Sequence, residues 1–188
     1  MEDLFDFQAL RVAQPAKWRP DRATYEIFTG DRQRVASVTE TAGHSQLSIL
    51  RESVPDTRVF AVTTPAGQPV FSLVKQASNW VTELRDPAGE LAGTIGTGNT
   101  RRTYTLRDTR GQAVGEVEGD LALKNYQVYG TGRRRVARVR KTWAGLAKEI
   151  LTPSDHYMVE FTGPVTQPAR TLIVMMPIVI DLTSYGPV

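Results

Sequence analysis

The sequence contains no cysteine, and its only histidines are His44 and His156. The absence of cysteine excludes disulfides, thiolate metal sites, thiol nucleophiles and S-acylation. Neither histidine has a metal-ligating partner near it in the sequence, so we interpret both as solvated or hydrogen-bonded side chains. No nucleophile elbow or glycine-rich nucleotide loop follows a predicted strand. We therefore expect no enzyme activity, no catalytic residues and no cofactor.

The sequence also lacks an apolar run of about 20 residues, the length that a helix needs to cross a bilayer. Its longest run, residues 172–180, is apolar throughout. Because an element that is hydrophobic on all sides must be surrounded by protein, we predict a buried central helix at about residues 168–183. Pro168 suits the first turn of this helix, whereas Pro177 should kink the helix or split it in two.

Five segments of the chain repeat one plan, in which a strand, a turn containing glycine and a second strand follow each other. A four-residue signature marks each second strand, at residues 35–38, 70–73, 92–95, 114–117 and 136–139. The last three signatures are 22 residues apart, about the length of one hairpin with its link to the next. This repetition predicts one continuous architecture of hairpins.

The turns of these hairpins have a recognisable chemistry. Asp86 and Asp108 each stand three residues before a glycine, Gly89 or Gly111, that is able to take a positive φ. This spacing predicts a type I turn followed by a bulge, with the aspartate side chain bonded to the backbone. The two aspartates resemble a carboxylate pair for acid–base catalysis, but the turn explains both of them.

Each second strand carries a small and an aliphatic residue two positions apart, and such residues share one face of a strand. The pairs are Ala36/Val38, Gly93/Ile95, Gly115/Val117 and Ala137/Val139, and the opposite face carries Ser37, Thr94, Glu116 and Arg138. One dry face of this kind suits either a closed barrel or a β-sandwich. The apolar helix favours the barrel, because it needs an enclosure.

The predicted fold is therefore mainly β, a closed antiparallel barrel of about 12 strands around a hydrophobic C-terminal α-helix. The count includes an opening strand at residues 9–14, the five pairs and a final strand at residues 156–161. We predict one domain, in which residues 1–24 form the first strand and lead-in and residues 25–188 form the rest. Residues 141–151 have helical spacing of apolar side chains and predict a short extra helix.

A resemblance to a known family starts in this last region. The chain reads Lys141-Thr142-Trp143-Ala144-Gly145-Leu146, then Lys148-Glu149 and Leu151-Thr152, then Phe161, then an apolar helix ending in Ile180-Asp181-Leu182. This series is similar to the C-terminal third of phospholipid scramblases. The hairpins resemble the wider superfamily with the tubby C-terminal domain, the plant LURP-one-related proteins and many small bacterial proteins. The resemblance implies a 12-stranded barrel around a C-terminal helix.

The resemblance also implies a calcium-binding segment directly after the Trp143 region. In the matching residues 153–161, only Asp155 and Glu160 are acidic. Calcium takes six to eight oxygen ligands, usually with several carboxylates. These two residues are an incomplete ligand set, so we predict no metal site.

Basic residues are concentrated in one part of the chain. Residues 101–148 contain 12 Lys/Arg and 4 Asp/Glu, whereas the whole chain has a net charge of only +3. The predicted lipid- or phosphate-binding residues are Arg133, Arg134, Arg135, Arg138, Arg140 and Lys141, with Arg101, Arg102 and Lys124 as neighbours. Guanidinium groups suit this role because each one pairs with two oxygens at once, and tubby-like relatives that bind phosphoinositides use lysine and arginine in this way.

These observations predict a non-enzymatic domain that binds anionic phospholipid headgroups or a membrane surface. The first alternative is a protein-interaction scaffold, and the second is phospholipid scramblase activity. A solvated strand face would explain the basic residues without any ligand, and nucleic acid is an unlikely partner because few aromatic side chains stand near them. The acidic N-terminus does not resemble a signal peptide, so we expect a cytoplasmic protein that lies peripherally at the inner membrane face.

Overall fold

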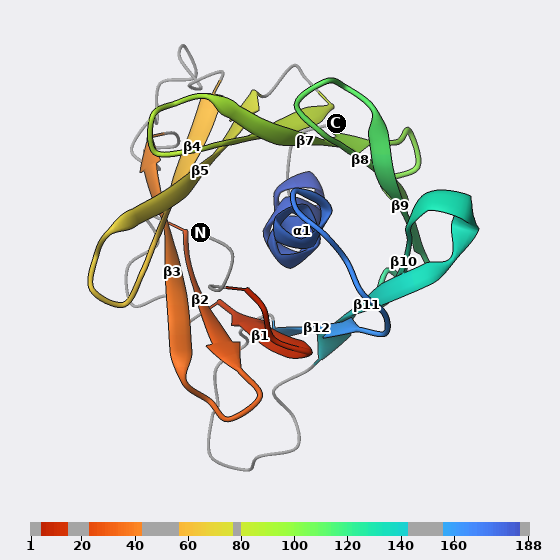
Figure 1. The fold of residues 1–188 in the computed structure, drawn as a ribbon, viewed down its shortest axis with the longest axis horizontal. Coiled ribbons are helices and arrows are strands. Elements are labelled where there is room, and N and C mark those ends of the chain that lie inside the picture. Colours follow the sequence, from red (N-terminus) through yellow and green to blue (C-terminus); the bar gives the residue numbers. More distant parts are fainter. Residues whose placement is uncertain (1–4, 15–22, 43–56, 77–79, 143–155, 185–188) are drawn as a thin grey trace, which may run out of the picture.

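Twelve antiparallel strands close into a barrel around a single helix (Figure 1). The computed structural model describes residues 5–14, 23–42, 57–76, 80–142 and 156–184. The strand order around the barrel is β1-β12-β11-β10-β9-β8-β7-β6-β5-β4-β3-β2, so β1 closes the barrel by pairing with both β12 and β2. The barrel is confirmed and the sandwich alternative is wrong.

The strands are short. Each pair of adjacent strands in the barrel is also consecutive in the sequence, except for β1 and β12. They are β1 (Ala9–Ala13), β2 (Thr24–Thr29), β3 (Arg34–Ala42), β4 (Thr57–Thr63), β5 (Pro69–Gln76), β6 (Val81–Arg85), β7 (Leu91–Thr97), β8 (Thr103–Arg107), β9 (Ala113–Gly119), β10 (Asn125–Tyr129), β11 (Arg135–Thr142) and β12 (His156–Phe161). A 3-10 turn, η1 (Thr131–Arg133), links β10 to β11, and the helix is α1 (Ala169–Ser184). The predicted first and last strands and the central helix agree with these bounds to within one residue.

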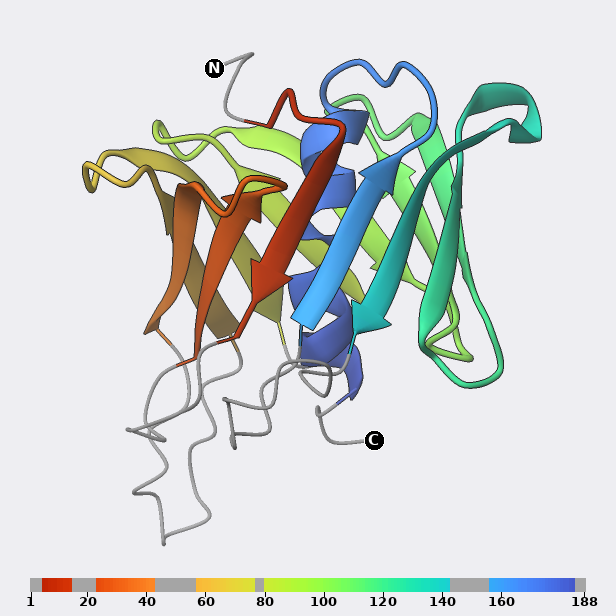
Figure 2. The same ribbon diagram turned by 90° about the horizontal axis from the view of Figure 1, so that it is seen from below.

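The two ends of the barrel differ in their connections (Figure 2). The hairpin end holds the turns at residues 30–33, 64–68, 86–90, 108–112 and 130–134, and α1 begins there. The rim end holds the turns at residues 98–102 and 120–124, and α1 ends there. Because successive connections of an up-and-down barrel alternate between its ends, each strand runs from one end to the other.

The helix fills the barrel. Every residue from Leu172 to Ile180 for which burial is described is at most 2% exposed. The wall comes close to the helix at Gly93, where an added Cβ would lie 3.2 Å from Leu172 Cδ1 and 2.9 Å from the Arg107 carbonyl oxygen. Glycine at this inward position lets the sheet approach the helix, as the small–aliphatic pairs predicted.

The aspartate turns are confirmed. The Asp86 Oδ1 atom accepts hydrogen bonds from the Ala88 and Glu90 amides, both at 2.9 Å, and Gly89 has φ +85°. Asp108 accepts the equivalent pair of bonds. A register shift follows Leu84 and marks the bulge. Both carboxylates are therefore occupied in holding turns, and nothing brings them together for catalysis.

The structure excludes a split of α1 at Pro177 and contradicts the start of the predicted extra helix. The helix α1 continues across Pro177 as one element instead of splitting, because the barrel packs against buried residues on both sides of the proline. Lys141 and Thr142, which we expected to begin an extra helix, belong to β11, where they pair with β12. The rest of that predicted helix, residues 143–151, lies outside the described residues.

Candidate functional site

The predicted basic residues do not form one cluster. Arg133, Arg134 and Arg135 lie at the hairpin end, at the turn before β11. The pair Arg101 and Arg102 lies at the rim end, in the turn between β7 and β8. Arg138, Arg140 and Lys141 follow β11 from one end toward the other. The sequence contained the signal for this separation, since a strand rises about 3.3 Å per residue and eight residues therefore span roughly 26 Å.

The charge of Arg133 is balanced within the hairpin end. Its Nη2 atom lies 2.8 Å from Glu118 Oε1, and its Nη1 atom lies 3.6 Å from Glu116 Oε2. Its guanidinium also lies over the Tyr129 ring, 5.2 Å from the centroid. The hydrogen bond and negative charge of Glu118 raise the pKa of Arg133. Although this side chain is 66% exposed, two carboxylates already compete with any anionic ligand.

Arg138 and Arg140 face outward, as predicted, because Ala137 and Val139, which alternate with them along β11, are fully buried. Arg138 donates a 2.8 Å hydrogen bond from Nη2 to the Asn125 side-chain oxygen. Arg140 donates from Nη2 to Glu160 Oε1 at 3.1 Å. Both arginines therefore bridge neighbouring strands, and each has only part of its guanidinium left for a ligand.

The ion pair with Arg140 also bears on the calcium candidates. Glu160 faces an arginine instead of a second carboxylate, and Asp155 lies outside the described residues. Within the part of the chain that the structure describes, no group of three or more histidine, aspartate or glutamate side chains is placed to hold a metal ion. His156 is half-buried at the start of β12, where its carbonyl oxygen accepts a hydrogen bond from Thr142.

Arg134 and Arg135 are exposed, and neither side chain has a partner among the described residues. Arg134 borders a pocket of about 310 Å³ between β9, β10, β11 and residues 164–169. Valine, glycine and proline provide much of the wall, and Arg134 is the only charged residue that lines it. The hairpin end thus offers a hollow of mixed polarity that is bordered by Arg134, and Arg135 is exposed next to Arg134 in the chain.

At the rim end, the backbone brings separate basic residues together. Arg102 Nε and Nη2 both donate to the Gly119 carbonyl oxygen at 3.3 Å, and the Gly119 amide donates to the Arg102 carbonyl oxygen at 2.6 Å. The Lys141 amide donates to the Lys124 carbonyl oxygen at 2.7 Å. These bonds place the turn of Arg101 next to the turn of Lys124, and Lys141 next to Lys124. Lys124 was predicted as a neighbour of the basic stretch, and its backbone does lie beside that of Lys141.

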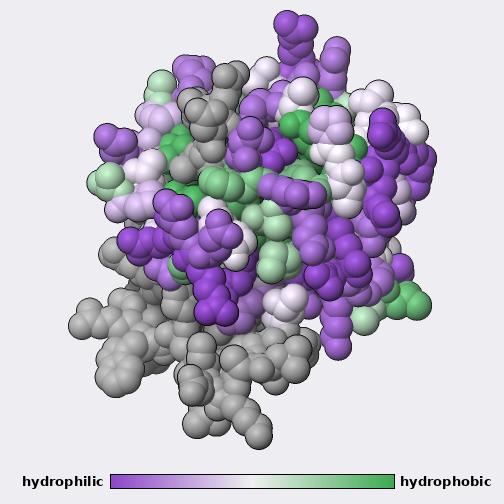
Figure 3. Space-filling view, turned by 60° about the horizontal axis from the view of Figure 1, so that its bottom comes forward, coloured by the Kyte–Doolittle hydropathy of each residue, from purple (hydrophilic) through white to green (hydrophobic). Residues whose placement is uncertain are grey.

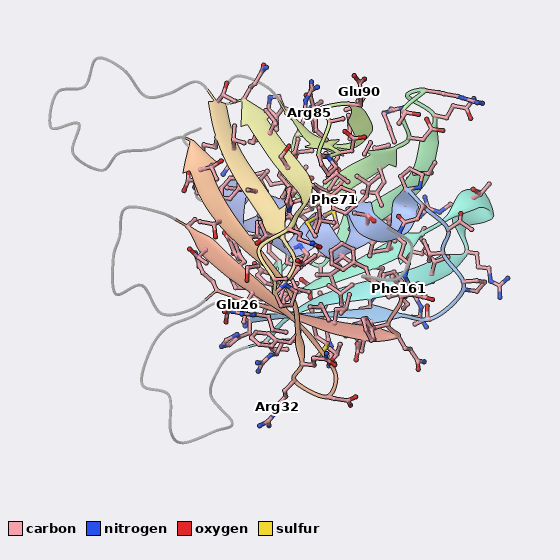
Figure 4. The ribbon with its side chains drawn as sticks, turned by 60° about the vertical axis from the view of Figure 1, so that its left-hand side comes forward. Glu26, Arg32, Phe71, Arg85, Glu90 and Phe161 are labelled. Carbon is pink, nitrogen blue, oxygen red and sulfur yellow. The ribbon has the colours of Figure 1, made fainter. Side chains whose placement is uncertain are left out.

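Two apolar side chains at the same end were missed. Leu121, in the β9–β10 turn, is 86% exposed, and Trp80, before β6, is 50% exposed. Hydrophilic side chains cover most of the face shown in Figure 3, so large exposed apolar residues are exceptions on this surface. Periodicity alone gave no signal for them, because a turn has no repeating face. Charged side chains are more usual on the outside of the barrel, as the labelled Arg32, Arg85 and Glu90 show in Figure 4.

The inside of the rim end is polar. The Tyr157 hydroxyl donates to Asp181 Oδ1 at 2.5 Å, and the Tyr104 hydroxyl lies 3.1 Å from Thr183 Oγ1. The hydroxyl of Tyr126 is buried and has no hydrogen-bond partner in the described part of the chain. Burial raises the pKa of both Tyr104 and Tyr126.

On β3, toward the rim end, the buried carboxylate of Glu40 is paired with Arg58. Glu40 is 5% exposed and accepts two hydrogen bonds from Arg58, at 2.8 and 3.0 Å. It also accepts one from the Ala23 amide at 3.1 Å. These groups hold the wall of the barrel together.

The profile of the Scramblase family matches residues 25–186. The chain belongs to the Scramblase family. An X-ray structure of an Arabidopsis thaliana protein matches with a TM-score of 0.58 at 14% identity, over 94% of this chain and 91% of that chain. At this identity the likeness shows the fold alone. Among curated proteins, none matches this chain. The described part of this scramblase-family protein has no helix that is long and apolar enough to span a membrane.

Proposed function

We propose that this domain binds anionic phospholipid headgroups at a membrane surface and catalyses no reaction. Membership of the Scramblase family supports an association with lipid or membrane. The observation that carries the proposal is the charge of the β8–β11 half of the barrel, where residues 101–142 contain 11 Lys/Arg and 4 Asp/Glu. Such a surface attracts the anionic lipids of a cytoplasmic leaflet. We therefore propose that the protein lies at the cytoplasmic face of the membrane.

The contacts separate the cations that can bind a ligand from those that hold the fold. Arg133 faces two glutamates, and Arg138 and Arg140 bridge strands. Arg134 and Arg135 are exposed without a partner in the described ranges. Each basic residue near an anionic bilayer contributes about 1 kcal/mol, so a few available cations give weak binding that salt opposes.

Vesicle flotation tests the proposal directly. We expect the protein to float with vesicles of phosphatidylcholine and phosphatidylserine at low ionic strength, and to stay behind with phosphatidylcholine alone. Added salt should release it, because exposed charges are screened. Equal flotation with both vesicles, or none at low salt, would contradict the proposal, and the second result would favour the protein-interaction alternative.

A pair of charge reversals provides a matched control. Arg101→Glu should weaken flotation with anionic vesicles, because it replaces a rim-end cation of the basic half that has no ion pair in the described ranges. Arg32→Glu makes the same charge change in the β2–β3 turn, on another part of the barrel, and should have a smaller effect. Equal effects would mean that only net charge matters and that the basic half is not a binding surface.

A further inference from the structure

Leu121 is the most exposed large apolar side chain in the described chain, at 86%. It shares the β9–β10 turn with Leu123, which packs against the core. The two leucines therefore differ in role. Leu123 packs against the core, whereas Leu121 is almost fully exposed. A single exposed leucine is common on protein surfaces, so what distinguishes Leu121 is the set of basic and aromatic residues beside it.

The turn that carries Leu121 is held in shape. Asp120 Oδ1 accepts a hydrogen bond from the Lys124 amide at 2.9 Å, and Asp120 Oδ2 accepts one from the Asn125 side chain at 2.8 Å. The Leu123 amide closes the turn on the Asp120 carbonyl oxygen at 3.2 Å. The position of Leu121 is therefore part of the fold. The hydrogen bond from Asn125 lowers the pKa of Asp120, whose negative charge is used within the turn.

The neighbouring turns place a tryptophan and cations beside this leucine. The Trp80 carbonyl oxygen accepts a hydrogen bond from the Thr97 amide at 2.7 Å, so Trp80 lies where β7 enters the turn of Arg101 and Arg102. The bond between Gly119 and Arg102 then joins that turn to the turn of Leu121. The order along the rim is Trp80, the arginine pair, Leu121 and Lys124.

We infer that the barrel docks on an anionic bilayer with its rim end, which places Leu121 below the phosphates and Trp80 at their level. This inference rests on the proposed function and adds the orientation of the domain. Charge complementarity favours a bilayer as the occupant, because Arg101 and Lys124 flank the leucine and would meet lipid phosphates. Tryptophan suits the interface because its ring is apolar and its N–H is polar.

The hairpin end is the rival surface. Its arginines at residues 133–135 are available in part, but Glu116 and Glu118 stand beside them. Its exposed large apolar residue, Phe7, is only 36% exposed. Docking through the rim end instead points the hairpin turns and the pocket beside Arg134 away from the bilayer.

The absence of cysteine makes the orientation measurable. Leu121→Cys gives a protein with one thiol, which can carry an environment-sensitive fluorophore at the rim end. Thr131→Cys places the same fluorophore at the hairpin end, beside the rival arginines. On phosphatidylserine-containing vesicles we expect a blue shift from position 121 and none from position 131.

The unlabelled variant Leu121→Ser tests whether the side chain contributes to binding. It leaves the charge unchanged and should weaken binding to anionic vesicles by about 10-fold, since a buried leucine is worth roughly the free energy of one decade in affinity. Ala122→Ser, at the next exposed position, should leave the affinity unchanged.

The outcomes separate this inference from the proposed function. A blue shift from position 131 alone, with unchanged affinity of Leu121→Ser, would overturn the rim-end docking and leave the proposed function standing. Failure of the wild-type protein to bind anionic vesicles would overturn both. Equal blue shifts at both positions would mean that the domain has no fixed orientation, and would also overturn the inference.

Discussion

The two ends of the barrel use charged residues in opposite ways. At the hairpin end, arginines bond to their own turns, as when Arg85 donates to the Gly89 carbonyl oxygen at 2.7 Å and Arg107 donates to that of Gly111 at 2.9 Å. At the rim end, basic turns stand beside exposed Leu121. A count of cations along the sequence therefore overestimates the charge that an end can offer to a ligand.

The interiors of the two ends differ as well. Phe5 and Phe71 stack near the start of α1, with ring centroids 6.4 Å apart, in an apolar environment. Near the end of α1, Asp181 and Thr183 turn the core polar, and Tyr157 and Tyr104 bond to them. The helix α1 thus runs from the hairpin end, whose interior is apolar and stabilised by packing, to the rim end, whose interior is stabilised by specific hydrogen bonds.

The largest expected effect comes from the middle of the helix, which both ends share. Val174→Asp puts a carboxylate at a position that is 0% exposed, among apolar side chains. An unpaired buried charge costs several kcal/mol or more, comparable to the whole stability of a domain. We expect loss of soluble expression. A folded variant with an unchanged melting temperature would show that α1 is not the core.

The next effect compares an ion pair from each end. Glu40→Ala removes the partner of Arg58 inside the rim end and should destabilise the protein by about 2–3 kcal/mol, less than for a fully buried pair because Arg58 is 33% exposed. Glu26→Ala removes the exposed partner of Arg34 near the hairpin end and should cost about 1 kcal/mol or less. Urea unfolding measures both, and equal losses would contradict the difference between the ends.

Two tyrosines sharpen the comparison within the polar end. Tyr157→Phe removes the hydroxyl that donates to Asp181 and should cost about 1.5–3 kcal/mol, because the acceptor is a buried carboxylate. Tyr126→Phe removes a buried hydroxyl that has no partner in the described part of the chain, and should be neutral or stabilising. Thermal unfolding of the two variants should therefore shift in different directions or by different amounts. Equal destabilisation would show that the Tyr126 hydroxyl has a role in the fold.

The smallest expected effect appears at alkaline pH. Burial raises the pKa of Tyr104 and Tyr126 above the ordinary tyrosine value of 10.0, so the folded protein keeps protons that the unfolded chain releases. The stability from these groups is complete below about pH 10 and falls as the pH rises above it. Unfolding measured from about pH 8 to about pH 11 should show this loss, and Tyr126→Phe should reduce it. Tyr129→Phe, a change outside the buried cluster, should leave the loss as in the wild type.

The fold was predictable because its signals are local. The inward pairs such as Gly93 and Ile95 follow from the period of a strand, and the turns at Asp86 and Asp108 follow from a spacing of three residues. Both kinds of signal need no knowledge of distant neighbours. The closed barrel then followed from the need to enclose residues 172–180.

The candidate site was harder to predict because its properties depend on neighbours across strands. Arg133 meets Glu116 and Glu118 only because β9 pairs with β10 in one register, with Tyr129 opposite Glu116. The exposure of Leu121 depends on how one turn projects from the wall of the barrel. No local pattern in the sequence indicates that projection. The sequence therefore predicted which residues are basic but not which of them remain available.

The position of α1 in the chain has a consequence for how the protein reaches its structure. The helix follows all twelve strands, and the closing pair of strands, β1 and β12, joins segments almost 150 residues apart. Contacts between such distant segments form slowly, and an open sheet exposes unpaired edges and an apolar inner face. During synthesis, all twelve strands are therefore made before the helix that forms their core. Folding of this domain is therefore completed from its C-terminal side, and its nascent chain depends on protection from aggregation until α1 is available.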